Sequence, residues 1–333
     1  MKSINFTITF CFILLSAVSA QEQNVFANVA RKTFAGLLKV SLSPPDVEVT
    51  VHNSREEEGL LIEDISWKSF DGKTVPAYVI RKANADHQLP AIICLHGSSG
   101  NRDAMVTKQF GPGEWLRPGS DKPHTRMLGW ARELARRGYL ILALTQRGLD
   151  TREPSSSSEA KIQLVNGNTA MGVIIDEIRQ GVTYLGNRPD VDPNRIGATG
   201  MSFGGITAFY LSLVDDRVAA SAPLCGGVGS VDVFIRTGNI DYHGFYWWVP
   251  GIVANGDQAW FASAMAPKPL MLWAPTEDIG MTKEAVDLFV SIVKPAYECK
   301  GKPRNFVVHQ PPGEHSFTME AFEAMVNFFD IHF

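Results

Sequence analysis

A serine in the second half of the chain has the surroundings of a catalytic nucleophile. Residues 200–204 read Gly-Met-Ser-Phe-Gly, with Ser202 at the centre. The apolar run 196–199 predicts a strand before it, and residues 206–213 predict a helix after it, so Ser202 is expected on a sharp strand-to-helix turn. Flanking glycines avoid clashes that a Cβ would create in such a turn. The helix N-terminus places partial positive charge where an oxyanion would develop.

A serine hydroxyl needs a base to remove its proton before it can attack a carbonyl carbon. His315 lies in the segment Gly-Glu-His-Ser-Phe, directly after a predicted strand at 305–309 and before a predicted helix. It is the only histidine in that loop, whereas the other histidines lie at a strand end, in the terminal tail or in earlier segments. The sequence therefore predicts His315 as the general base.

The acid that orients such a histidine is expected between the serine and the histidine, after the predicted strand 269–273. Asp278 and Glu277 both follow that strand. Asp278 is preferred because residues 279–282 lead from it into the next helix, and Glu277 stays as the alternative. The order Ser, Asp, His differs from the orders of trypsin-like and subtilisin-like enzymes.

Acyl transfer also needs two preorganised N–H groups for the oxyanion. The N–H of Phe203, directly after the nucleophile, is one candidate. The loop after the third strand, Leu-His-Gly-Ser-Ser-Gly at 95–100, supplies the other, and we choose the N–H of Ser98. His96 in the same loop is interpreted as a brace that holds the loop by hydrogen bonds.

The elements that must position these residues alternate along the chain. Short apolar runs that predict strands lie at 62–70, 75–80, 91–95, 139–144, 195–199, 218–223, 269–273 and 305–309. Segments with helical character lie between them at 126–137, 169–185, 203–213, 282–293 and 317–329. This alternation predicts an α/β fold with a mostly parallel sheet and helices on both faces.

One stretch, residues 226–262, interrupts the alternation after the sixth strand. It is rich in glycine and aromatic residues and holds the run Phe-Tyr-Trp-Trp. An insertion at this point is expected to lie over the strand ends, where open α/β sheets bind ligands. We predict a lid-like insertion in which His243, Trp247 and Trp248 contact the substrate. Packing of these aromatics into the insertion's own small core is the open alternative.

The N-terminus and the composition indicate the localisation, the domain bounds and which partners to expect. Lys2, an apolar run and the small residues before Gln21 predict a signal peptide at 1–20, and hence a secreted or periplasmic protein without stable membrane association. An N-terminal helical extension is expected at 21–60 and the catalytic domain at 61–333. The net charge of −4 argues against nucleic acid as a partner.

Cysteine and histidine spacing gives no metal site, and we expect no cofactor. Neither Cys-x-x-Cys nor His-x-x-x-His occurs. After signal removal three cysteines remain, and a disulfide between Cys225 and Cys299 is left open.

With these residues in place, the chain resembles the dienelactone-hydrolase-like and acetyl-xylan-esterase-like branch of the α/β hydrolases. The resemblance runs from about Leu61 to the C-terminus and is most specific at 95–100, 188–197, 266–270 and 313–317. It implies the α/β-hydrolase fold and an ester hydrolase that works through an acyl-enzyme, with acetylated plant polysaccharides or oligosaccharides as substrates. Dienelactone hydrolases proper carry Cys where this chain has Ser202, and many acetyl xylan esterases carry Gln where it has Phe203.

Two other functions are compatible with the motifs. A prolyl-oligopeptidase-like peptidase shares the triad order, but the segment before the first predicted strand is too short for the propeller of those enzymes. A non-catalytic binding protein could use the same scaffold. Such a protein typically lacks a member of the triad, and here all three candidates are present.

Overall fold

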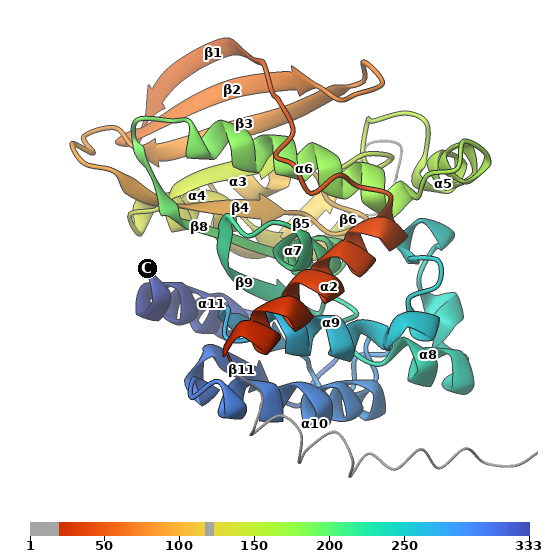
Figure 1. Cartoon of the computed structure of the whole chain (residues 1–333). Coiled ribbons are helices and arrows are strands. Elements are labelled where there is room, and N and C mark those ends of the chain that lie inside the picture. The colour runs from red at the N-terminus through yellow and green to blue at the C-terminus, as the bar shows by residue number, and fades with distance from the viewer. Residues whose placement is uncertain (1–19, 117–122) are drawn as a thin grey trace, which may run out of the picture.

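A computed structural model describes residues 20–116 and 123–333 (Figure 1). The predicted signal peptide therefore lies outside the described residues, apart from Ala20. Within the described part of the chain, no helix combines the length and apolar character needed to cross a membrane.

Within the described residues, a sheet of nine strands forms the centre of the molecule (Figure 1). Its spatial order is β1 (Val49–Glu57), β2 (Leu60–Lys68), β3 (Thr74–Lys82), β7 (Leu140–Leu144), β4 (Leu89–Leu95), β8 (Val191–Met201), β9 (Val218–Leu224), β10 (Leu270–Trp273) and β11 (Phe306–His309). The pairs from β1 to β7 are antiparallel, and all later pairs are parallel. Every side chain of β7 is buried, as expected of a strand that is covered on both faces. The predicted α/β fold with a mostly parallel sheet is confirmed.

Helices cover both faces of this sheet. They are α2 (Ala20–Leu38), α3 (Arg102–Val106), α4 (Trp130–Arg136), α5 (Ser156–Val165), α6 (Ala170–Gly186), α7 (Phe203–Val214), α8 (Val231–Thr237), α9 (Asp257–Met265), α10 (Lys283–Cys299) and α11 (Met319–His332). Short 3₁₀ turns lie at η1 (Asn239–Tyr242), η2 (Phe245–Trp247), η3 (Val253–Asn255) and η4 (Pro303–Asn305). Helices α6 and α7 pack on one face, and α4 and α11 on the other (Figure 1). Side-chain oxygens of Thr169 and Thr318 cap the N-termini of α6 and α11.

The structure contains strands that the sequence did not predict. β1 lies inside the segment 21–60, where only helix was expected, and pairs with β2. β5 (Gly111–Leu116) and β6 (Pro123–Leu128) form a separate two-stranded sheet. The helix predicted at 126–137 therefore begins later, at Trp130. Gly129 separates β6 from α4 at φ +62°, a left-handed conformation that glycine adopts without strain.

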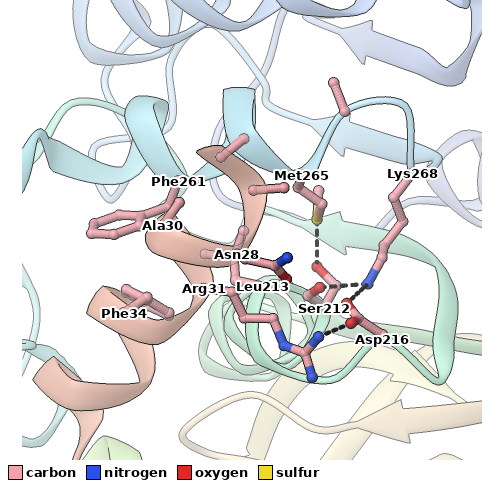
Figure 2. A pocket seen from close by; sticks show the side chains of 13 residues that line it. Asn28, Ala30, Arg31, Phe34, Ser212, Leu213, Asp216, Phe261, Met265 and Lys268 are labelled. Carbon is pink, nitrogen blue, oxygen red and sulfur yellow. Dashed lines mark hydrogen bonds and ion pairs between the residues drawn. The ribbon is translucent and has the colours of Figure 1, made fainter. Parts of the chain in front are cut away.

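Helix α2 packs against α6, α7 and α9. Phe34 is fully buried there, with its ring against Tyr210 and Phe261. Arg31 from α2 forms an ion pair with Asp216, beside a small cavity of about 130 Å³ (Figure 2). Helix α2 thus buries Phe34 and Leu38 on the body of the protein, whereas Val25 and Val29 stay exposed.

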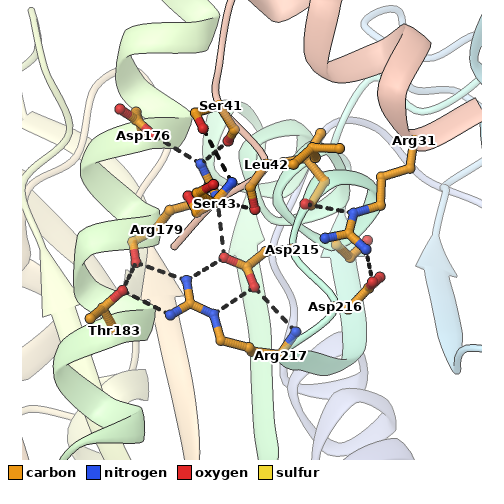
Figure 3. Close-up of polar contacts among 12 residues, drawn as sticks. Arg31, Ser41, Leu42, Ser43, Asp176, Arg179, Thr183, Asp215, Asp216 and Arg217 are labelled. Atoms are coloured by element: carbon orange, nitrogen blue, oxygen red, sulfur yellow. Dashed lines mark hydrogen bonds and ion pairs between the residues drawn. The ribbon is translucent and has the colours of Figure 1, made fainter. Parts of the chain in front are cut away.

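A second contact holds the chain just after α2. The guanidinium of Arg179, on α6, donates hydrogen bonds to the backbone oxygens of residues 41, 42 and 43 (Figure 3). Its Nε also donates to Asp215, which accepts from Arg217 as well. Because Arg179 is 1% exposed, this segment is fixed by a buried charge–carbonyl network.

Candidate active site

Ser202 occupies the strand-to-helix turn that the sequence predicts. β8 ends at Met201, α7 begins at Phe203, and Ser202 between them has φ +57° and ψ −117°. A Cβ at Gly200 or Gly204 would collide with the carbonyl oxygen of Leu95 on the neighbouring strand β4. The glycines are therefore required by close packing as well as by the turn. The conformation of Ser202 is strained for a non-glycine residue, and such strain is typical of functional sites.

His315 and Asp278 form a hydrogen-bonded pair. His315 Nδ1 lies 2.8 Å from Asp278 Oδ2, and the other carboxylate oxygen accepts the N–H of Gly280 at 2.7 Å. Asp278 is 1% exposed, whereas His315 is half-buried. Glu277, the alternative acid, is exposed to solvent. Of the two acids that the sequence left open, Asp278 is thus the one that contacts the imidazole.

A cavity of about 640 Å³ lies at the carboxyl ends of the central strands. Ser202 and His315 both line it, together with Ser98, His243 and Trp247 from the predicted site. The Phe203 side chain is fully buried, so only its backbone N–H could serve a ligand. Trp248, in contrast, does not line the cavity but packs against Phe234 and His243.

Several cavity-lining residues were not singled out from the sequence. They include Met105, Arg126, Trp130 and Tyr242. Tyr242 and Tyr246 belong to the same aromatic-rich insertion as Trp247, which was the available signal. Their neighbour Phe245 is 57% exposed. The 3₁₀ turn η2 thus sends consecutive aromatics in different directions, which no sequence periodicity reveals.

The loop after β4 is braced by the buried His96. Its Nδ1 lies 2.8 Å from the Gly97 oxygen, and its Nε2 accepts the N–H of Gln146 at 3.0 Å. The amide of Gln146 in turn donates to the His96 oxygen and accepts from Thr207 on α7. Burial lowers the pKa of His96 to about 4, so the ring is neutral at pH 7. His96 braces this loop by hydrogen bonds, as predicted from the sequence.

We expect acid to destabilise the fold through His96 and His243, because burial lowers the pKa of each to about 4. Between pH 6.5 and pH 4 these two histidines bind protons in the unfolded chain but stay neutral in the folded chain. The stability present above pH 6.5 is therefore lost as pH falls through this window, on the order of 3 kcal/mol per histidine. Urea unfolding at several pH values measures the loss. His243→Gln should weaken the dependence of the free energy of unfolding on pH. If that dependence stayed unchanged, it could not be assigned to His243.

Cys225 lies next to the His315–Asp278 pair. Its side chain is buried and takes no part in a disulfide with Cys299. Burial, followed by the nearby Asp278 carboxylate, raises its pKa well above the usual range. Ligand atoms of Cys225, Asp278 and His315 lie within 4.8 Å of one another, but a metal ion would need the Cys225 thiolate, which the raised pKa disfavours. A cation held by Asp278 Oδ2 and His315 Nδ1 would displace the proton they share.

Comparisons with known proteins find similarity to a hydrolase family and to a hydrolase of Bacillus subtilis. Residues 122–239 match the family model described as the Dienelactone hydrolase family. YtaP, a candidate hydrolase of Bacillus subtilis, is 28% identical over 259 residues, which cover 78% of this chain and 83% of YtaP.

Solved structures share the fold at low sequence identity. A candidate acetyl xylan esterase from Bacteroides fragilis superposes with a TM-score of 0.70 at 16% identity, over 89% of this chain and 77% of that one. A glucuronoyl esterase from Solibacter usitatus gives 0.67 at 15% identity, over 91% and 92% of the two chains. The chain therefore shares the α/β-hydrolase fold of these structures, and its residues 122–239 are similar to the dienelactone hydrolase family.

Proposed function

We propose that the chain is an exported serine carboxylic ester hydrolase that works through an acyl-enzyme. The observation that carries the proposal is one cavity lined by both Ser202, on its strained turn, and His315, whose Nδ1 is held by Asp278. A nucleophile, a base and an orienting acid are the parts that acyl transfer requires.

In the first half-reaction, Ser202 Oγ attacks the ester carbonyl carbon while His315 Nε2 accepts the hydroxyl proton. Asp278 stabilises the imidazolium that forms. The negative charge moves to the carbonyl oxygen, where the N–H groups of Phe203 and Ser98 are the proposed donors. The bond to the alcohol oxygen then breaks, and His315 returns the proton to the leaving alcohol.

In the second half-reaction, water attacks the acyl group on Ser202. His315 accepts a proton from this water and then gives it to Ser202 Oγ as the carboxylic acid departs. Both ring nitrogens of His96 are engaged with backbone groups, Nδ1 with the Gly97 oxygen and Nε2 with the Gln146 N–H, so its role is to fix the loop rather than to donate to the oxyanion.

An esterified carbohydrate is the proposed substrate class. The cavity of about 640 Å³ is much larger than an acetyl group needs, and its lining includes the aromatic residues Trp130, Tyr242 and Tyr246. Aromatic side chains can pack on sugar rings and aryl groups. The carbohydrate-esterase names of the similar folds support this class.

A fluorophosphonate probe tests the mechanism directly. It should label the wild-type protein and leave Ser202→Ala unlabelled. A panel of p-nitrophenyl esters beside aminoacyl anilides then tests the substrate class, and the esters should be cleaved faster. Faster cleavage of the anilides would instead indicate a peptidase, and absence of labelling would indicate a non-catalytic binding protein.

Tyr242 is expected to contribute to substrate affinity. It is 43% exposed at the cavity, with its ring centre 6.1 Å from that of His315. Removing the ring in Tyr242→Ala should raise KM for an aryl or sugar ester about 2- to 10-fold, the effect of losing one stacking contact. KM for methyl acetate should change less.

Trp248→Ala provides the matched control for this prediction. Trp248 packs inside the insertion and does not line the cavity. Its removal should lower Tm and leave KM unchanged. A larger KM effect from Trp248→Ala than from Tyr242→Ala would mean that the substrate lies elsewhere.

A further inference from the structure

The nine residues 239–247 of the insertion contact both loops on which the proposed chemistry depends. On one side they meet the loop that carries Asp278. On the other they meet Ser98 and Phe203, the proposed oxyanion donors. These contacts come from the turns η1 and η2 and from His243 between them, so one short segment joins two loops that are more than 170 residues apart in the chain.

The contacts to the acid loop are hydrogen bonds between side chains of this segment and backbone oxygens of the loop. Asn239 Nδ2 donates to the Ile279 oxygen at 2.8 Å, and His243 Nε2 lies 2.7 Å from the Gly280 oxygen. Gly280 is also the residue whose N–H binds Asp278 Oδ1. His243 therefore holds the peptide unit next to the one that orients the carboxylate.

His243 is itself rigidly placed. Its ring stacks on Trp247 at 4.0 Å with an interplanar angle of 22°. The side chain is 8% exposed and stays neutral at pH 7, because burial lowers its pKa to about 4. A neutral, stacked imidazole is well suited to a fixed hydrogen bond rather than to proton transfer.

The contacts to the oxyanion side converge on Tyr246. Its hydroxyl donates to Ser98 Oγ at 2.8 Å, and its ring packs edge-on against Phe203 with ring centres 5.0 Å apart. Trp247 adds a second ring contact to Phe203 at 5.3 Å. Tyr246 thus touches both residues whose N–H groups are the proposed oxyanion donors.

We propose that residues 239–247 act as a clamp, in which Tyr246 positions the oxyanion donors and His243 with Asn239 positions the acid loop. These are positioning residues, since they act through Ser98, Phe203 and Gly280. This inference rests on the proposed ester hydrolysis. The insertion then contributes to the chemical step itself, in addition to forming a wall of the cavity.

Tyr246→Phe is the sharpest test, because it removes the hydroxyl and keeps the ring against Phe203. With p-nitrophenyl acetate, kcat should fall about 10-fold, the size of one lost hydrogen bond, while KM stays within 2-fold. The inhibition constant of phenylboronic acid, which binds serine as a tetrahedral adduct, should rise by the same factor as kcat falls. If the Tyr246 hydroxyl only stabilised the fold, the inhibition constant and kcat would not change by the same factor.

A double-mutant cycle assigns the effect to the contact. Ser98→Ala removes the acceptor, and Tyr246→Phe combined with Ser98→Ala should be no slower than either single variant. Additive losses would overturn the proposed clamp. Asn239→Ala tests the acid-loop side independently and should also lower kcat with little change in KM.

Tyr297→Phe is the matched control. Its hydroxyl is buried and donates to the Lys268 oxygen at 2.6 Å, away from the cavity. It should lower Tm and leave kcat unchanged.

Wild-type labelling by a fluorophosphonate is checked first: without it the proposed function fails. If labelling occurs and Tyr246→Phe keeps kcat within 2-fold, only the clamp is wrong.

Discussion

Replacing Asp278 by Asn should reduce kcat by about 10⁴-fold and leave the fold intact. The amide keeps an oxygen for the N–H of Gly280, but its NH₂ group faces His315 Nδ1 in place of the carboxylate. The imidazole is then held in the tautomer whose Nε2 already carries a proton and cannot accept the one from Ser202. Steady-state kinetics and thermal unfolding of the same sample measure the two quantities.

Glu277→Gln is the matched control for this experiment. Glu277 precedes Asp278 in the chain, but its side chain is exposed. Its variant should keep kcat within about 2-fold, as expected of a surface substitution. If Glu277→Gln lost the activity and Asp278→Asn kept it, the acid would have to be reassigned.

The largest effect on stability is expected from Arg147→Met. Arg147 is 2% exposed and bonds the carboxylates of Asp71, Glu159 and Glu177 at 2.6–3.1 Å. Glu159 and Glu177 are each 1% exposed. Removal of the guanidinium leaves buried carboxylates with less neutralising charge, which should lower the free energy of unfolding by about 3–5 kcal/mol. Urea unfolding at pH 7 measures this loss.

Arg236→Met is the comparison. Arg236 pairs with Asp232 at 3.0 Å, but both side chains are more than half exposed. Its removal should cost less than about 1 kcal/mol. Equal losses in the two variants would show that burial does not set the strength of the Arg147 cluster.

Strands β4 and β7 could be predicted because their sequences are apolar throughout, and β9 differs only at Ser221. All three strands are largely buried, as expected of strands covered on both faces. β1 gives no such signal, since its side chains are exposed or half-exposed along the whole strand. Its pairing with β2 depends on backbone hydrogen bonds, which a side-chain pattern does not record.

The candidate site also has a part that the sequence predicts and a part that it does not. Ser202, Asp278 and His315 follow strands at positions that the hydrolase topology fixes, so strand order alone brought them to one end of the sheet. The contact between Tyr246 and Ser98 depends on how an irregular insertion folds over that end. The same irregularity explains Trp248, which was expected at the substrate and instead packs on Phe234.

The two borders of the sheet have a consequence for self-association. At one border β11 is only four residues long. At the other, β1 carries a bulge between Val51 and Asn53, and its last three residues are Arg55, Glu56 and Glu57. Short, irregular or charged edges are poor templates for a strand from a second molecule. The sheet can therefore end in solvent on both sides without inviting edge-to-edge aggregation.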